Sequence, residues 1–266
     1  MDTGFDNVDG VDNTDALKNY LDVTYSLSQQ RRAASIQLLG NISGCTVLEV
    51  GCGLGVDAIT LGQLVGVTGR VIAVDKSKTF VTEAKRRGAP LNLPVEFLVD
   101  DISNLNLPSE SVDAVFGDRV LQVLAQPAAA VLEVHRVLRR GGRAVFNEPD
   151  WETLVLDSAH REVTRRLLNL RCDRREGEGW MGRQLLRLFT EAGFSEIGCQ
   201  SFPFIIQDFN IADQIYHFKS TVQTASLEGL ISSGEGQDWL NDLIEQSRRN
   251  CFFCGITLYT IVGTKT

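Results

Sequence analysis

Three glycines that follow an apolar run are the clearest chemical signal in this sequence. Residues 47–59 read VLEVGCGLGVDAI, so four apolar-rich positions lead into Gly51, Gly53 and Gly55, and a helical pattern follows. Glycines at such a strand-to-helix turn let the backbone approach a ligand closely, because no Cβ stands in the way. A dinucleotide fingerprint would read G-x-G-x-x-G, but the third glycine comes one residue early and position 56 is Val. The turn alone therefore leaves the ligand open.

Acidic side chains stand where the next strands are expected to end. The segment RVIAVD ends at Asp75, whose carboxylate can accept hydrogen bonds from both hydroxyls of a ribose. The following strand ends before Asp101 and Ile102, which can bind the amino group and cover the ring of an adenine. In open α/β sheets, ligands bind beyond the carboxyl ends of the strands. A single acid at a strand end is often only a turn former or a helix cap. Several acids at successive strand ends, all following one glycine turn, predict an adenosine-type ligand.

The order of expected elements predicts a doubly wound α/β fold. Runs rich in apolar and β-branched residues alternate with helical patterns, as in a parallel sheet buried on both faces. These strands are expected at 46–50, 70–75, 95–100, 112–117 and 143–148, the last closed by Pro149. Helices are expected at 15–39 and 128–140, the second ending at Gly141-Gly142. After Pro149, the patterns predict helical stretches at 151–193 and 210–247, with strands at 194–206 and 252–262.

This order divides the chain into three parts. Residues 1–40 are expected to form a helical lid segment, with 1–15 frayed because they are acidic and poor in apolar residues. Residues 41–150 form the cofactor-binding core, and 151–266 supply the remaining strands together with helical acceptor-binding insertions. The aromatic content of the insertions indicates a small, hydrophobic organic partner enclosed by the lid.

Composition narrows the possible partners. The chain has 266 residues, of which 43% are hydrophobic and 23% charged, as in ordinary globular proteins. A net charge of -8 argues against a nucleic-acid partner. No apolar stretch is long enough for a membrane span, and the acidic start does not read as a signal peptide, so we expect a cytoplasmic protein. The six cysteines lack the spacing of a metal site, and Cys251-x-x-Cys254 reads as structural.

Several segments together resemble one family, the class I S-adenosylmethionine-dependent methyltransferases. The similarity is to the small-molecule branch that includes ubiquinone and menaquinone biosynthesis enzymes. The matching segments are VLEVGCGLG, VIAVDKS, FLVDDISNLNLP, VDAVFGDRVLQVL and EVHRVLRRGGRAVFNEPDW, within residues 30–150, followed by GRQLLRLFTEAGF and CFFCGITLYTIVGTK. The family commonly has Asp where Glu49 stands. The resemblance implies a seven-stranded sheet with its last strand antiparallel, and S-adenosylmethionine as cofactor.

The resemblance also implies positions for the cofactor. Its methionine end would lie against Glu49, Gly51, Cys52, Gly53 and Gly55, and Gly117 and Asp118 would face the methionyl chain. Its adenosine would be held by Asp75, Lys76, Asp101 and Ile102. Its carboxylate would meet Arg32, with Arg31 as the rival position, because a guanidinium can fork onto a carboxylate.

Methyl transfer from a sulfonium requires few dedicated catalytic groups. The protein chiefly aligns the nucleophile and the methyl group in a dry pocket. Aromatic faces favour a cation, so Tyr20, Tyr25 and Trp151 are candidates for the acceptor side. A base is needed only for a poor nucleophile, and His217 is the best of three histidines, although a packing role is as consistent with its aromatic neighbours. We assign no single catalytic residue and expect no metal.

Three other functions stay open. A nicotinamide-dependent oxidoreductase is disfavoured by Val56 and by the acid at Asp101. A macromolecular methyltransferase is disfavoured by the net charge and by GDRV after the fourth strand, where an N/D-P-P-Y/F motif would be expected. A non-catalytic S-adenosylmethionine-binding protein is compatible with the sequence, because the reaction needs so few residues. The sequence indicates neither the oligomeric state nor which atom of the acceptor, N, O or C, is methylated.

Overall fold

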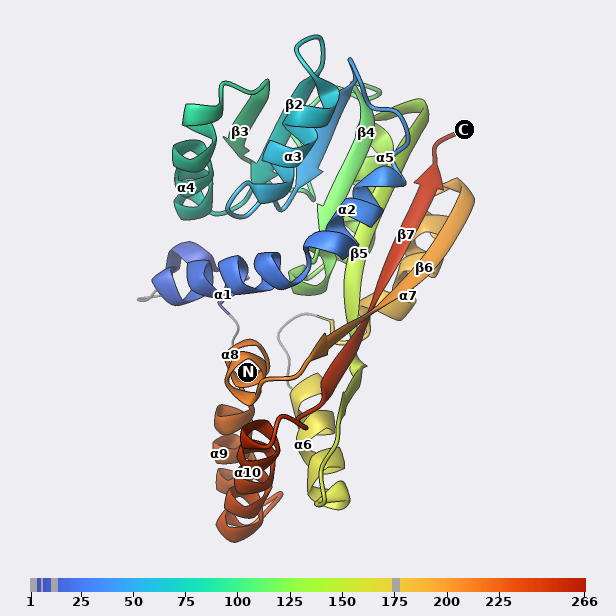
Figure 1. The fold of residues 1–266 in the computed structure, drawn as a ribbon. Coiled ribbons are helices and arrows are strands. Elements are labelled where there is room, and N and C mark those ends of the chain that lie inside the picture. The colour runs from blue at the N-terminus through green and yellow to red at the C-terminus, as the bar shows by residue number, and fades with distance from the viewer. Residues whose placement is uncertain (1–3, 6, 11–13, 174–177) are drawn as a thin grey trace.

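A seven-stranded sheet forms the centre of the computed structural model, which describes residues 4–5, 7–10, 14–173 and 178–266 (Figure 1). The strand order is β3-β2-β1-β4-β5-β7-β6. β7 runs antiparallel to both of its neighbours, and the other pairs are parallel. The predicted doubly wound, mostly parallel sheet with an antiparallel last strand is thus confirmed. The strands are β1 (Thr46–Val50), β2 (Arg70–Asp75), β3 (Val95–Val99), β4 (Val112–Asp118), β5 (Leu138–Leu156), β6 (Ser195–Ile206) and β7 (Cys254–Thr264).

Successive side chains of the central strands pack against different helices, because their Cβ atoms point to opposite faces of the sheet. On β1, Val47 packs with residues of α2, α3 and α4, whereas Leu48 and Val50 pack with residues of α5 and α7. Both faces are therefore covered, which is why the strands read as apolar runs. The covering helices are α2 (Gln29–Gln37), α3 (Val56–Val65), α4 (Lys78–Gly88), α5 (Pro127–Val137) and α7 (Met181–Glu191).

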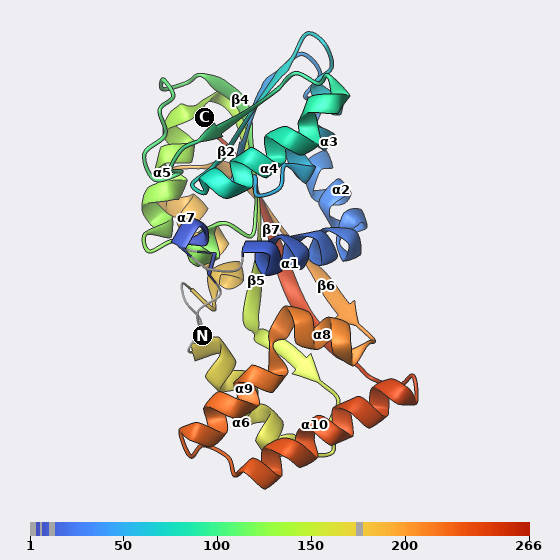
Figure 2. The same cartoon turned by 90° about the vertical axis from the view of Figure 1, so that its left-hand side faces the viewer.

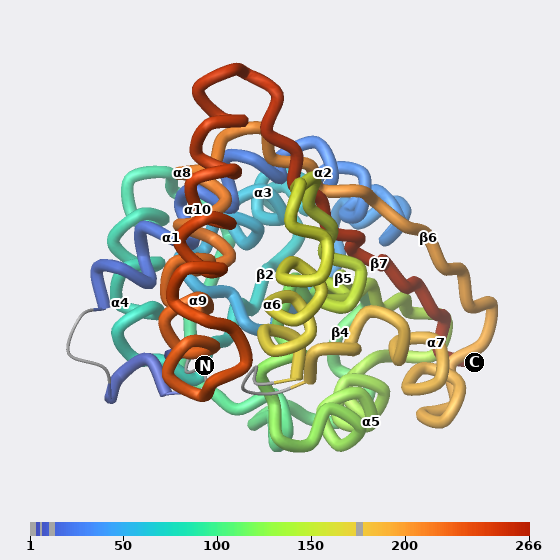
Figure 3. Tube along the Cα trace, turned by 90° about the horizontal axis from the view of Figure 1, so that it is seen from below, coloured from blue at the N-terminus to red at the C-terminus, as the bar shows by residue number. Residues whose placement is uncertain are grey.

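A second helical group lies beyond the carboxyl edge of the sheet, on the far ends of β5, β6 and β7 (Figures 1 and 2). The view from below in Figure 3 looks onto this group, with the sheet behind it. Its core is aromatic: Trp239, Tyr216 and Phe218 are almost fully buried, and the Trp239 indole donates to the Thr164 hydroxyl at 2.9 Å. The helices are α6 (Arg161–Asp173), α8 (Phe209–Tyr216), α9 (Phe218–Leu227) and α10 (Ser233–Arg248).

The helical pattern predicted over 15–39 forms two helices. α1 (Thr14–Leu27) crosses the carboxyl edge of the sheet and ends before Ser28, and α2 follows at a changed direction and packs on a face of the sheet (Figure 1). The Ser28 hydroxyl donates to the Thr24 carbonyl at 2.6 Å, a local bond that competes with the helical ladder and bends it. Short 3₁₀ turns lie at Val8–Gly10, Ala89–Leu91 and Leu121–Val123.

β5 differs most from its prediction. The preceding helix ends at Val137 and not at 140, and β5 continues through Pro149 to Leu156, so residues 151–156 are strand and not helix. Pairing with β4 stops at Asn147. Pro149 follows Asn147, the last residue of β5 that pairs with β4. Because no β4 residue lies opposite Pro149, the N–H that proline lacks is not needed there. The strand therefore carries the chain from the sheet into the second helical group.

The predictions about membrane spans and cysteines can be compared with the described residues. No helix among them is long and apolar enough to cross a membrane. All six cysteines are free, and Cys254 is buried at the start of β7, whereas Cys251 is exposed just before it. The division at residues 40 and 150 stays a prediction.

Candidate functional site

A cavity of about 520 Å³ opens at the carboxyl edge of the sheet. The sequence-predicted residues that line it come from strand ends and from α1, regions far apart in the chain. They are Tyr20, Tyr25, Gly51, Gly53, Asp75, Lys76, Asp101, Ile102 and Asp118. The fold thus brings together nine of the predicted site residues around one space.

The glycine turn forms the floor of this cavity. Gly53 has a φ of 49°, and a Cβ placed on it would lie 2.9 Å from the Tyr25 hydroxyl oxygen. Its amide donates to the Asp75 carboxylate at 2.8 Å, and the Ser77 amide donates to the other oxygen of that carboxylate at 2.9 Å. Burial raises the pKa of Asp75, and these two bonds oppose the rise. The carboxylate is held rigidly at the end of β2, facing the cavity.

Two residues of the N-terminal stretch that was expected to be frayed lie at the cavity. Phe5 and Val8 line it, and the Phe5 ring lies 5.3 Å from the Tyr20 ring. The Asp9 carboxylate accepts from the Ser77 hydroxyl at 2.8 Å and from the Lys78 amide at 2.8 Å, at the N-terminus of α4. A carboxylate is favoured there because it satisfies free amides and the helix dipole. Residues 1–3, 6 and 11–13 lie outside the described residues.

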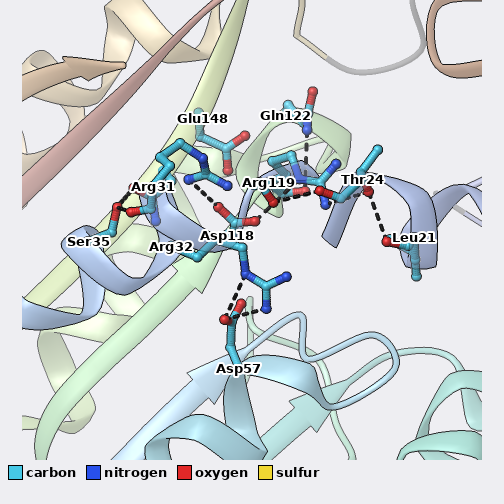
Figure 4. Close-up of polar contacts among 12 residues, drawn as sticks. Leu21, Thr24, Arg31, Arg32, Ser35, Asp57, Asp118, Arg119, Gln122 and Glu148 are labelled. Carbon is cyan, nitrogen blue, oxygen red and sulfur yellow. Dashed lines mark hydrogen bonds and ion pairs between the residues drawn. The ribbon is translucent and has the colours of Figure 1, made fainter. Parts of the chain in front are cut away.

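Buried charges meet beside the cavity (Figure 4). Asp118, at the end of β4, forms ion pairs with Arg31 at 2.8 Å and with Arg119 at 3.3 Å. Burial would raise the pKa of Asp118, but these two guanidinium groups outweigh it and lower that pKa to about 2. Arg32 donates from Nε to the buried Asp57 at 2.9 Å. Burial raises the pKa of Asp57, and the charge of Arg32 opposes the rise.

Two further acids are buried without a cationic partner in contact. The Glu148 carboxyl lies under the turn after β4, accepting from the Leu121 amide at 2.6 Å, and burial raises its pKa to about 8. Burial also raises the pKa of Glu49 well above its usual range, with the charge of Asp57 adding to the effect. The Glu148 carboxyl group is therefore mainly protonated near neutral pH.

Some predicted residues lie behind the cavity wall. Arg32 is hydrogen-bonded to Asp57. Its guanidinium lies over the Tyr25 ring, 4.1 Å from the ring centroid, so the ring separates it from the cavity. The remainder pack under the glycine turn and the neighbouring strand. They are Glu49, Cys52, Gly55 and Gly117. At Gly55 a Cβ would lie 2.8 Å from the Phe97 ring, so this glycine allows close packing of helix on strand.

A second, smaller pocket of about 40 Å³ adjoins the first, sharing Tyr20, Arg119 and Gln122 with it. The predicted Trp151 lies here, and its indole donates to the Gln122 side chain at 2.9 Å. The Tyr216 ring meets Trp151 edge to face at 5.9 Å. Together these side chains form an aromatic slot next to the cofactor-sized cavity.

Sequence reasoning did not identify several of the lining residues. Arg119 was visible in GDRV, but nothing in its spacing showed that its backbone, with a φ of 59°, turns the side chain toward Tyr20 and Tyr25. Phe80 lies outside the matching segments, and Gln122 lies within VDAVFGDRVLQVL but was assigned no role there. His217 lies at the junction of α8 and α9 and lines neither pocket, so its catalytic or acceptor-binding role stays a prediction.

Sequence similarity to known proteins identifies the family of this chain. A family described as a methyltransferase domain matches residues 48–146, which include the glycine turn and the ends of β2 and β4. A protein of 37.1 kDa from a transposon of Streptomyces fradiae is 37% identical over 251 residues, covering 93% of this chain and 71% of that protein. A demethylmenaquinone methyltransferase of Lactococcus lactis is 31% identical over 128 residues, covering 47% of this chain and 50% of the relative. This chain belongs to the class I S-adenosylmethionine-dependent methyltransferases.

The methyltransferase shares its fold with solved structures of the family. Phosphoethanolamine N-methyltransferase 2 of Haemonchus contortus, in complex with S-adenosyl-L-methionine, aligns with a TM-score of 0.62 at 15% identity, over 100% of this chain and 60% of that one. The cofactor is S-adenosylmethionine. The similarity spans only about half the length of the Lactococcus relative. The methyl acceptor of that relative therefore does not identify the acceptor of this methyltransferase.

Proposed function

We propose that this methyltransferase transfers the methyl group of S-adenosylmethionine to nitrogen or oxygen of a small, largely hydrophobic organic acceptor. The proposal rests on the two adjoining pockets that share Tyr20, Arg119 and Gln122. A cofactor in the larger pocket and an acceptor in the aromatic slot would meet at these shared side chains. That meeting point is where the sulfonium methyl group and the nucleophile have to be aligned.

The adenosine half of the cofactor would lie between the ends of β2 and β3. In this arrangement the Asp75 carboxylate accepts from the ribose hydroxyls, while Asp101 and Ile102 hold the adenine and Lys76 lies beside it. Phe80 and Phe5 would cover the adenosine end of the cofactor, since both line the cavity and their ring centroids are 6.3 Å apart. These roles are supported by the cavity lining, with Asp75 already oriented by backbone amides.

The methionyl half would lie over Gly51 and Gly53, with Asp118 near its amino group. We assign its carboxylate to Arg119, because that guanidinium lines the cavity whereas Arg32 is bound to Asp57. Arg32 stays the alternative. In either case the guanidinium could form a charge-assisted, forked pair with the carboxylate.

The reaction would be an in-line displacement at the methyl carbon. Alignment of nucleophile and methyl at about 3 Å in a dry pocket can supply roughly 7–11 kcal/mol of the required acceleration. The aromatic rings of Tyr20 and Tyr25 would stabilise the sulfonium cation. We propose secondary metabolism as the setting of the reaction, and a cytoplasmic location stays a prediction.

Calorimetry with S-adenosylhomocysteine tests the cofactor site. We expect binding by the wild-type protein and a loss of at least about tenfold in affinity for Asp75→Ala, because two ribose hydrogen bonds are removed. Asp238→Ala, at an exposed aspartate of α10 that lines neither pocket, is the matched control. Binding of a nicotinamide dinucleotide in place of S-adenosylhomocysteine would support the oxidoreductase alternative.

Turnover distinguishes an enzyme from a non-catalytic binding protein. Release of S-adenosylhomocysteine from S-adenosylmethionine should depend on an acceptor in a panel of phenols, enols, amines and quinols. Cofactor binding without acceptor-dependent release across such a panel would favour a binding protein.

A further inference from the structure

The small aromatic slot contains polar groups for which no described residue supplies a hydrogen-bond partner. Tyr216 is 2% exposed, and its hydroxyl has no hydrogen-bond partner among the described residues. Arg31 is 8% exposed, and beyond its ion pair with Asp118 none of its nitrogens donates a hydrogen bond of good geometry to a described residue. A buried donor without a partner costs about 1–3 kcal/mol, so these groups are suited to a ligand that accepts hydrogen bonds.

The ion pairs around the slot leave a surplus of positive charge. Arg31 and Arg119 share a single carboxylate, Asp118. Arg32 is matched by Asp57. Three guanidinium groups thus face two carboxyl groups, those of Asp118 and Asp57, in a region that is largely buried, where an unbalanced charge is poorly screened.

Among the described residues, the other acids near the slot have raised pKa values. Burial raises the pKa of Glu148 to about 8, so it is mainly protonated near neutral pH, and burial raises the pKa of Glu49 well above its usual range. Burial raises the pKa of Tyr216 well above its usual range, so it stays a hydroxyl. Arg171 lies behind the slot, 5.2 Å from the Trp151 ring centroid, and adds no negative charge.

The cofactor would increase the positive charge further. Its amino-acid end carries one charge of each sign, whereas its sulfonium carries a positive charge that nothing in the cofactor balances. An ammonium group would therefore be repelled from the slot, and an anion would be attracted.

We propose that the acceptor is a flat, largely apolar molecule with an acidic hydroxyl, a phenol or an enol, which binds in the slot as its oxyanion against Arg31 and is methylated on that oxygen. The flat body would lie against the Trp151 and Tyr216 rings, which meet edge to face, and the Tyr216 hydroxyl would donate to the bound molecule. This inference rests on the proposed function and narrows its acceptor from nitrogen or oxygen to oxygen.

The reaction step balances without a dedicated base. The hydroxyl proton passes to water when the acceptor binds, because the guanidinium groups lower the pKa of the hydroxyl. A lone pair of the oxyanion forms the O–C bond to the methyl carbon, while the C–S bond breaks and its electron pair stays on sulfur. The products are a neutral ether and S-adenosylhomocysteine, so opposite charges are neutralised in a water-poor pocket. None of the three histidines lines either pocket, as far as the described residues show.

4-Nitrophenol tests this proposal because its anion is yellow and its neutral form is not. With protein saturated by S-adenosylhomocysteine, we expect the bound phenol to stay anionic at a pH about one unit below its titration in water. Arg31→Gln should weaken binding of the anion by about tenfold, and Tyr216→Phe by a few fold, since each removes one donor. Arg165→Gln, at an exposed arginine of α6, is the matched control and should change neither value. With S-adenosylmethionine in place of the product, the yellow colour should be lost as the ether forms.

The outcomes separate this inference from the proposed function. If S-adenosylhomocysteine itself does not bind, the proposed function fails. If it binds but 4-nitrophenol does not, or if the phenol binds with an unshifted titration, the oxyanion inference is overturned and the proposed function stands. Methylation of 4-nitroaniline in preference to 4-nitrophenol would also overturn it. If Arg31→Gln does not fold, Arg31→Lys together with Tyr216→Phe gives the same comparison.

Discussion

Replacing Glu148 with Gln should change how the stability of the protein depends on pH. In the fold, burial raises the pKa of Glu148 to about 8, whereas its ordinary value is 4.5. Between these two pH values the unfolded chain has lost the proton while the folded protein retains it, so stability falls as pH rises. The glutamine variant carries no such proton and should lack this fall.

The magnitude follows from the pKa difference. From pH 5 to pH 8 the wild-type protein should lose about 3.5 kcal/mol through Glu148, at about 1.36 kcal/mol per unit of pKa difference. In Glu148→Gln the introduced amide oxygen can still accept from the Leu121 amide, but the introduced NH₂ group would replace an oxygen that has no partner among the described residues. That exchange should cost about 1–2 kcal/mol at every pH. We therefore expect the variant to be less stable than wild type near pH 5 and more stable near pH 8.

Urea unfolding at four pH values between these limits measures the difference directly. Glu191→Gln, at an exposed glutamate at the end of α7, is the control and should stay within about 0.5 kcal/mol of wild type throughout. A stability difference between Glu148→Gln and wild type that does not vary with pH would refute the reasoning, since it would show that Glu148 is ionised in the fold.

Three further predictions concern the walls of the cofactor cavity. Asp9→Ala should weaken binding of S-adenosylhomocysteine in calorimetry and destabilise the protein by about 1 kcal/mol, because the N-terminus of α4 loses an acceptor; unchanged affinity would show that the segment does not cover the ligand. Gly53→Ala should abolish measurable cofactor binding, because a Cβ at this positive φ meets the Tyr25 hydroxyl oxygen at 2.9 Å, and wild-type affinity would contradict the geometry of the turn. Asp57→Asn should lower the free energy of unfolding by about 3–5 kcal/mol in denaturant titrations, because Arg32 would be left buried without its ionised partner; a loss below about 1 kcal/mol would count against a buried ion pair.

The sheet and the cofactor cavity could be predicted because their signals are local. The strands read as apolar runs, the glycines occur at a strand-to-helix turn, Asp75 ends one predicted strand and Asp101 follows the next. Once the strands are parallel, their carboxyl ends meet at one edge, so side chains far apart in sequence come together without further information.

Features that depend on tertiary contacts could not be predicted. Asp9 reads as part of an acidic tail, and its role follows only from the free amides of α4 that it meets across the fold. The extension of β5 past Pro149 depends on β4 having ended beside it. Arg32 was expected at the cofactor, but its partner Asp57 is on a helix that no local pattern connects with it.

β5 and β7 pair both beside the cofactor cavity and inside the second helical group, and this affects how ligands enter and leave. The pairing resumes at Val155 after an irregularity that follows Asp150, so two stretches of hydrogen bonds connect these parts of the molecule, and we expect the parts to move together. We therefore expect the contacts of Phe5, Val8 and Asp9, and not an opening between the two parts, to control entry of the cofactor and loss of the product. An extension placed ahead of Phe5 should consequently alter the rate of product release while leaving the preference among acceptors unchanged.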